Sequence, residues 1–477
     1  MELFNTFNGI QRMLKNCFTV REIQQQMSTG QLTSEAMVTE ALLSIEQNSE
    51  HHAFITIDRE GALAQAKHYD RLRKEGKTVG PLHGIIVAIK DNIHVAGLPN
   101  TAGTEALRNF IPDKDATVIC RLKAAGAIII GKTNMHELAY GITSDNKVFG
   151  SVGNAFSSAF IAGGSSGGTA TAVALNMAVV GLGTDTGGSV RIPASLNGLV
   201  GFRPSTNRYP SEGLTGISYT RDTVGPIVSS IEDAQLLDVI LSEETGKCDE
   251  VTLANLRIGI PREYFYDNLE PLIAEKIELL LEQLKQAGVE LVYANLESIG
   301  EISEQIGFPV VLHETKELLS AYLDSNLPNE TLDSLVDKIS DLGVNGAIDM
   351  ALNGSITKAV YEDAINIFRP QLQQLYARYF SQQKIDAIIF PTTPLSARPI
   401  EGSEETVELN GVQVPTFTTY IHNTDPASNA GVPGLSIPLS STDDGLPFGV
   451  EIDGPVNSDR RLLAIGLEIE KLINSNC

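Results

Sequence analysis

The sequence GGSSGGTATAVALNMAVVGLGTDTGGSVRIP, residues 163–193, contains the clearest evidence of fold class in this chain. Residues 170–179 are small or apolar with helical periodicity, and residues 181–184 resemble a short buried strand. Glycine-rich turns lie at residues 163–168 and 187–188. A helix followed by a buried strand, with glycines that permit close packing, is typical of an α/β fold.

The same alternation continues on both sides of this block. Short β-rich runs occur at residues 84–89, 127–130, 199–202, 256–260, 290–293, 387–390 and 435–438. Helical periodicity fills many of the intervals, for example residues 116–125. We therefore predict an α/β fold in which a large mixed β-sheet is covered by helices on both faces.

No linker or charge block divides the chain, so we predict one structural domain built from four consecutive segments. Residues 1–80 are expected to form a helical segment packed on the core, with a capping box at Thr19 and Glu22. Residues 81–260 form the α/β core. Residues 261–385 form a helical insertion, with amphipathic helices at 273–287 and 360–380. Residues 386–477 return to the sheet and end in a helix at 461–473.

Composition narrows the class of protein. The 477 residues include 59 acidic and 35 basic side chains, a net charge of −24. This balance argues against direct nucleic-acid binding and against docking on anionic membranes, and it favours a small-molecule substrate. We predict a cytoplasmic protein for three reasons. The four cysteines are scattered, the N-terminus is not leader-like, and no apolar run reaches about 18 residues. The sequence is compatible with a homodimer.

Two motif matches have competing interpretations. Residues 126–133, GAIIIGKT, fit the phosphate-loop pattern, but the four middle residues should form a flexible turn and here read as a strand, with Lys132 at its end. Residues 163–167, GGSSG, fit the nucleophile elbow of α/β-hydrolases. That interpretation makes Ser165 the nucleophile, with His422 as base and Asp386 as acid, and it remains open. The histidines have no metal-ligand spacing, so no metal site is expected.

Three segments together indicate chemistry. Lys90 ends an apolar run, and burial would lower its pKa towards neutrality, so that it could act as a general base. The second segment is the Ser165 turn. In the third, Thr186, Gly187 and Gly188 precede Ser189, and their uncrowded backbone N–H groups suit an oxyanion hole. Asp185 and Arg191 bracket this turn and are expected to pair.

These three segments resemble the amidase signature family, and the likeness runs from about residue 20 to the C-terminus. The resemblance implies a Ser–Ser–Lys triad that cleaves amides without a cofactor. By position, Ser189 is the nucleophile, Ser165 relays the proton and Lys90 is the base. The resemblance also implies a cis peptide bond between Gly164 and Ser165.

Segments outside the triad indicate a branch of that family. Residues 201–210, 220–226 and 422–434 are similar to those of indoleacetamide and mandelamide hydrolases, which implies a primary amide of aryl-acetic type as substrate. Met135, Tyr140 and His422 are the expected substrate-binding residues. Two alternatives remain: the A subunit of glutaminyl-tRNA amidotransferase, which acts on glutamine, and a non-catalytic binding scaffold.

Overall fold

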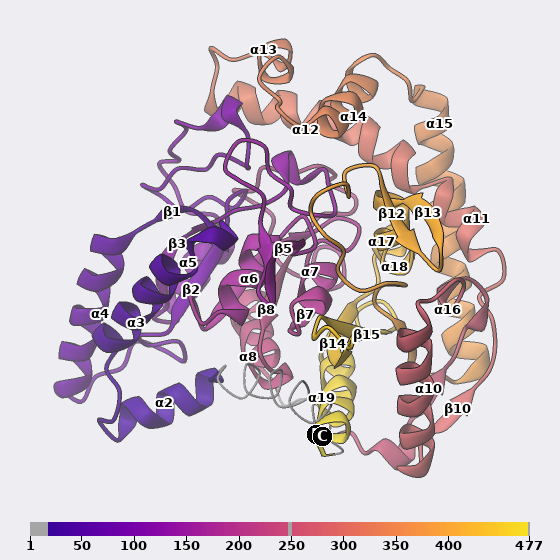
Figure 1. The fold of residues 1–477 in the computed structure, drawn as a ribbon, viewed down its shortest axis with the longest axis horizontal. Helices are drawn as coiled ribbons and strands as arrows, with labels where there is room; N and C mark the ends of the chain where they lie inside the picture. The colour runs from indigo at the N-terminus through magenta and orange to yellow at the C-terminus, as the bar shows by residue number, and fades with distance from the viewer. Residues whose placement is uncertain (1–17, 247–249, 476–477) are drawn as a thin grey trace.

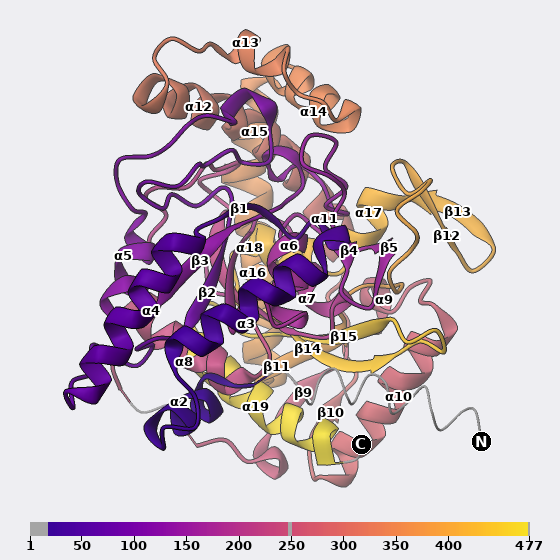
Figure 2. The ribbon, with the colours of Figure 1, turned by 60° about the vertical axis from the view of Figure 1, so that its left-hand side comes forward.

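The computed structural model describes residues 18–246 and 250–475. Within these residues, eleven strands form one mixed sheet with helices on both faces, which confirms the predicted fold class (Figure 1 and Figure 2). In spatial order the strands are β1 (Phe54–Ile57), β3 (Ile128–Thr133), β2 (Ile86–Lys90), β6 (Val180–Asp185), β8 (Thr223–Val228), β7 (Val200–Arg203), β14 (Gly434–Ser441), β15 (Pro447–Asp453), β11 (Ala387–Pro391), β9 (Arg257–Gly259) and β10 (Glu290–Val292).

Strand direction brings two parts of the predicted site to one edge of the sheet. β2 runs parallel to β6, whereas β6 runs antiparallel to β8. The carboxyl ends of parallel neighbours meet at the same edge, where open α/β sheets bind ligands. Lys90 at the end of β2 and Asp185 at the end of β6 are therefore brought together by the sheet itself.

The eight predicted β-runs all contain strands of this sheet, but β1, β8 and β15 are not among them. β1 lies at the edge of the sheet, is only partly buried and has only four residues, so its apolar run is short. β8 contains Pro226 and Gly225, which are uncommon inside strands. β15 contains Glu451 and Asp453, both completely buried, and buried carboxyls break the apolar run by which a central strand is recognised.

Helices fill the intervals between the strands. Figure 1 shows α12 to α15 grouped at one end of the molecule. The helices are α2 (Val20–Ser28), α3 (Ser34–Gln47), α4 (Arg59–Lys74), α5 (Thr117–Ala124), α6 (Gly167–Ala174), α7 (Arg191–Leu196), α8 (Ile231–Ser242), α9 (Arg262–Phe265), α10 (Pro271–Gln286), α11 (Ile299–Glu304), α12 (Gly307–Asn326), α13 (Leu332–Val336), α14 (Leu342–Leu352), α15 (Lys358–Asp363), α16 (Arg369–Gln383), α17 (Thr416–Ile421), α18 (Asp425–Ala430) and α19 (Asp459–Ser475). Two short antiparallel hairpins pair β4 (Gly153–Asn154) with β5 (Ser157–Ile161) and β12 (Thr406–Leu409) with β13 (Val412–Pro415).

Local sequence explains where several helices begin and end. The capping box of Thr19 and Glu22 opens α2, as predicted. The helix predicted at 170–179 instead spans Gly167–Ala174, because Asn176 has a left-handed backbone (φ 55°) and Val180 already belongs to β6. The helix predicted at 360–380 is interrupted by a π-turn over Ala364–Phe368. Pro370, which has no N–H to donate, lies just after this turn.

Around β7 and β8 the sheet separates two apolar layers, whereas at β2 and β3 the main core reaches both faces. On one face the main core packs α8 and α19 against the strands, with Leu237 and Leu462 among its members. On the other face a smaller cluster joins α6 and α7, and Val173 and Ala194 belong to it. The turn between β6 and α7 leaves the sheet on the side of this second layer.

Some sequence predictions concern residues outside the described part of the chain. The expectation that the N-terminus is not leader-like rests on residues 1–16, and Cys17, Cys248 and Cys477 also fall outside the described ranges. Cys120 is a free, exposed thiol. Among the described helices, none combines the length and apolar character needed to cross a membrane.

Candidate active site

Lys90 lies completely buried at the carboxyl end of β2, where segments from three parts of the chain meet. Its Nζ donates to Ser165 Oγ at 2.8 Å and to Thr184 Oγ1, on neighbouring β6, at 2.8 Å. The predicted proximity of Lys90 and Ser165 is therefore present in the structure. Thr184 lies within the glycine-rich block of residues 163–193, and it is a partner of Lys90 that the sequence pattern does not indicate.

The environment of Lys90 shifts the pKa of its amine towards neutrality. Burial lowers the pKa of Lys90 from 10.5 to about 7, and the charges of Asp185 and Asp222 oppose that shift. Asp222 lies on the segment before β8, and its own pKa is raised by burial. A lysine with a pKa close to the surrounding pH populates the neutral form that can accept a proton.

Ser165 lies in the glycine turn that leads into α6. The peptide bond between Gly164 and Ser165 is cis, as the family resemblance implied. The Ser165 carbonyl oxygen accepts a hydrogen bond from the backbone N–H of His136 at 3.2 Å. Ser166 N–H donates to the carbonyl oxygen of Ser189 at 3.2 Å, so the two serine-bearing turns are directly connected.

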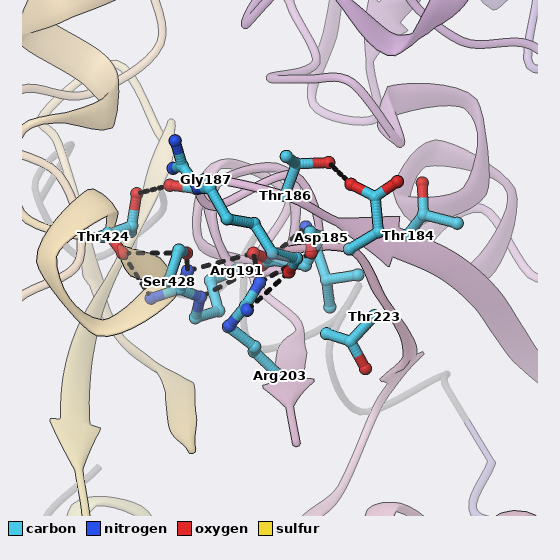
Figure 3. Close-up of polar contacts among 12 residues, drawn as sticks. Thr184, Asp185, Thr186, Gly187, Arg191, Arg203, Thr223, Thr424 and Ser428 are labelled. Carbon is cyan, nitrogen blue, oxygen red and sulfur yellow. Dashed lines mark hydrogen bonds and ion pairs between the residues drawn. The ribbon is translucent and has the colours of Figure 1, made fainter. Parts of the chain in front are cut away.

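A buried ion network supports the turn that contains Ser189. Arg191 Nε and Nη2 donate to the two carboxylate oxygens of Asp185 at 3.1 and 3.0 Å, which confirms the predicted pair. Arg203 Nη1 adds a second cation to Asp185 at 2.8 Å. In Figure 3, dashed lines join both guanidinium groups to Asp185. Burial alone would raise the pKa of Asp185, but Arg191 and Arg203 hold that pKa below its usual range. The Asp185 carboxylate therefore remains ionised.

The Thr186–Gly188 segment is held from both sides. Thr186 Oγ1 donates to Asp222 Oδ1 at 2.6 Å, and Thr424 Oγ1, from the chain before α18, donates to the Gly187 carbonyl at 2.6 Å (Figure 3). Gly188 has φ +143°, and a Cβ atom there would collide with Thr424 Oγ1. Only glycine fits both the backbone and the space at this position.

The backbone donors of this turn are available for a ligand. Among residues 18–246 and 250–475, no hydrogen bond engages the N–H groups of Thr186, Gly187, Gly188 or Ser189. Gly187, Gly188 and Ser189 are buried, with Ser189 only 7% exposed, and Thr186 is partly exposed. Backbone N–H groups that are held rigid and unpaired are suited to bind a developing oxyanion.

The three predicted substrate-binding residues do not form one group. Met135 is buried in a small cluster with Ala139 and Ile217, against which Tyr140 also packs. Met135 directly precedes His136, whose N–H contacts Ser165, so this cluster borders the Ser165 turn. His422 instead stacks on Tyr264 at a centroid distance of 3.9 Å, at the end of α17.

The groups needed for the nucleophile-elbow alternative are engaged elsewhere. His422 Nε2 lies 3.1 Å from the backbone oxygen of Tyr264, and Asp386 pairs with Arg461 at 2.6 Å. Ser165 Oγ accepts its hydrogen bond from Lys90 instead. The phosphate-loop match fails as expected, because residues Ile128–Thr133 form β3. Lys132 lies near the end of β3, is completely buried and pairs with Asp91 at 3.1 Å.

Other contributors come from distant segments of the chain, and no sequence motif assigns them to the site. They are Asp222 before β8, Arg203 on β7, Thr424 before α18 and Glu451 on β15. The similarity of residues 201–210, 220–226 and 422–434 to one family branch is the available clue for Arg203, Asp222 and Thr424. No local pattern points to Glu451.

Comparison with known proteins agrees with this geometry. The model of the Amidase family matches residues 36–463. An indoleacetamide hydrolase from Allorhizobium ampelinum is 40% identical, with 91% of this chain and 94% of the relative covered. A mandelamide hydrolase from Pseudomonas putida is 41% identical, with 95% and 91% covered. A solved amidase structure superposes with a TM-score of 0.85 at 33% identity, covering 95% of this chain and 99% of the other.

The match extends over nearly the whole chain, and it includes the segments that carry Lys90, Ser165 and Ser189. Sequence similarity, the shared fold and the arrangement of this site all agree. The chain therefore belongs to the amidase family and is an amide-cleaving hydrolase.

Proposed function

We propose that this enzyme hydrolyses primary amides of aryl-acetic type to a carboxylate and ammonia, through an acyl-enzyme on Ser189. The observation that carries the catalytic part of the proposal is the 2.8 Å hydrogen bond between Lys90 Nζ and Ser165 Oγ. It places a fully buried lysine against a serine whose turn is bonded to the turn of Ser189.

In the proposed mechanism, protons move along the chain of three residues. Neutral Lys90 accepts the proton of Ser165 Oγ as Ser165 accepts the proton of Ser189 Oγ, which attacks the amide carbonyl carbon. The C–N bond then breaks, and the proton returns from Lys90 through Ser165 to the departing nitrogen, which leaves as ammonia. Water, activated by the same relay, attacks the acyl-enzyme and releases the carboxylic acid and Ser189.

The oxyanion forms at the carbonyl oxygen during each attack. The N–H groups of Thr186, Gly187 and Gly188 are the proposed donors, since none has a partner among the described residues. Thr186 and Gly187 are fixed by Asp222 and Thr424, so these donors do not need to reorganise when charge develops.

The substrate class rests on similarity and on the character of the nearby side chains. The two relatives described above are named for indoleacetamide and mandelamide, each a primary amide with an aromatic acyl part. Met135, Ile217 and Tyr140 form an apolar cluster that borders the Ser165 turn. An apolar acyl group gains binding energy from such surroundings, whereas the polar side chain of glutamine does not.

Ammonia release from a panel of amides tests this proposal. We expect indoleacetamide and mandelamide to give kcat/KM values at least about tenfold above those of malonamide, short aliphatic amides and glutamine, because burial of an aromatic ring stabilises by more than about 1.4 kcal/mol. A preference for glutamine would instead support the amidotransferase alternative. Failure of every amide, with Ser189 also unreactive, would support the scaffold alternative.

Replacement of His422 by alanine separates the two hydrolase mechanisms. In the Ser–Ser–Lys mechanism His422 is not a base, so we expect kcat to fall by less than about tenfold, through loss of its stacking on Tyr264. An elbow enzyme that lost its base would lose about six orders of magnitude in kcat. Steady-state rates of ammonia release decide between the two mechanisms. Tyr264→Phe is the matched control, because it keeps the ring that stacks on His422.

A further inference from the structure

Two carboxyl side chains lie inside the molecule on β15, on the face opposite the main core. Phe448, Val450 and Ile452 belong to the main core, so the alternation of the strand turns Glu451 and Asp453 to the other face, towards Arg191 of α7. Both carboxyl groups are completely buried. Buried carboxylates are rare unless each is paired with a cation or with hydrogen-bond donors.

The available donors do not satisfy these two groups. Glu451 Oε1 accepts from Arg191 Nη1 at 2.5 Å. Among the described residues, no donor from another side chain or from the backbone reaches Glu451 Oε2 or either oxygen of Asp453, and the two carboxyl groups lie within hydrogen-bond reach of each other. Three acceptor atoms in one buried place lack a donor, and an ionised carboxylate cannot supply one.

The groups converge on one point beside Gly434. Gly434 pairs with Asp453 across the ladder between β14 and β15. A Cβ atom on Gly434 would lie 2.8 Å from Asp453 Oδ1, 3.0 Å from Glu451 Oε1 and 3.2 Å from Arg191 Nη1. The two carboxyls and the guanidinium are therefore immediate neighbours.

Charge balance in this network leaves no cation for Asp453. Arg191 and Arg203 are balanced by Asp185 and Glu451, with which the guanidinium groups make their ion pairs. An ionised Asp453 would add one uncompensated buried negative charge, which is costly enough that such a group takes up a proton instead. Burial and the charge of Glu451 raise the pKa of Asp453 well above its usual value, in agreement with this argument.

We propose that Glu451 and Asp453 share one proton, so that Asp453 is a neutral acid whose O–H donates to Glu451 Oε2 and holds the carboxylate that binds Arg191. One proton supplies the missing donor, satisfies Glu451 Oε2 and neutralises the network. Asp453 then acts as a positioning residue. It orients Glu451, Glu451 orients Arg191, and Arg191 closes the turn of Ser189 through Asp185 and the Thr424 carbonyl.

The protonation state is testable without any activity. Infrared difference spectra at neutral pH, native protein minus Asp453→Asn, should show a band in the carbonyl-stretch region of protonated carboxylic acids. Asp443→Asn, which removes an exposed carboxyl from the turn that leads into the same strand, should show none. Absence of the band in the Asp453 difference would overturn the proposal.

One competing donor has to be tested as well. The hydroxyl of Tyr376, on α16, is also buried without a partner among the described residues, and the charges of Asp453 and Glu451 act on it. If Tyr376 donated to an ionised Asp453, no acid band would exist in the native protein. We expect Tyr376→Phe to retain the band, and its loss in that variant would contradict the shared proton.

The kinetic consequence rests on the proposed function and is measured separately. An asparagine amide can donate to Glu451 as the neutral acid does, whereas alanine cannot. We expect Asp453→Ala to lower kcat by about tenfold with a smaller change in KM, because the Ser189 turn loses its fixed placement, and Asp453→Asn to recover most of that loss. Equal losses in both variants, or none in alanine, would contradict the positioning role. If alanine fails to fold, the asparagine variant and the infrared band still decide the question.

Discussion

Replacement of Ser189 by alanine is expected to lower kcat for amide hydrolysis by about four to six orders of magnitude, the largest effect that any single substitution should have here. Without Ser189 Oγ no acyl-enzyme can form, and only binding and the oxyanion donors remain. The backbone of the turn should be unchanged, because Arg191, Asp185 and Thr424 hold it through contacts that do not involve the Ser189 side chain.

Two further measurements make the Ser189 result specific. Ser211→Ala removes an exposed hydroxyl from a loop and should retain full activity, with the same far-UV circular dichroism as the native enzyme. Quenching the native enzyme during turnover, followed by peptide mass spectrometry, should place the acyl group on the peptide that contains Ser189. An acyl group on Ser165, with Ser189→Ala still active, would establish the elbow mechanism instead.

Replacement of Lys90 is the second large effect. Lys90→Met keeps most of the side-chain volume and removes the amine, and we expect kcat/KM to fall by at least about a thousandfold, since general-base catalysis contributes roughly 10²–10⁴-fold. Lys90→Arg should not restore activity, because arginine keeps its proton at any pH the enzyme tolerates. Near-normal turnover in either variant would eliminate the Ser–Ser–Lys assignment.

The pH dependence of the native enzyme tests the role of Lys90 without replacing Lys90 itself. Burial lowers the pKa of Lys90 to about 7, and the base must be neutral to act. We therefore expect kcat/KM to rise as the pH increases through about 7 and to decline below it.

Substitution of Asp222 by asparagine removes a negative charge that stabilises the ammonium form of Lys90, so the midpoint of this rise in kcat/KM should move to lower pH. A midpoint that moves to higher pH would contradict the electrostatic role of Asp222.

Part of this site can be predicted from the sequence because short, continuous segments of the chain carry the pattern. An apolar run ending in Lys90, and glycines around Ser165 and Ser189, are properties of short segments. Strand and turn preferences act over such distances, so the amino-acid pattern predicts eight of the strands and the turns that carry the candidate serines. The interrupted helix at 360–380 shows the limit of this reasoning, since amphipathic periodicity alone does not reveal the π-turn that precedes Pro370.

The sequence by itself therefore determined the α/β class, the position of the reactive turns and the residue types available for chemistry. Only the tertiary structure decided how these are held. Asp222, Thr424 and Glu451 lie far along the chain from Ser189, and β15 brings two carboxyls to Arg191 from more than 250 positions away. Burial, and hence the lowered pKa of Lys90, exists only after the sheet has assembled, and so does the second pairing of Asp185, with Arg203. Desolvation and charge pairing depend on distance in space and not on distance along the chain.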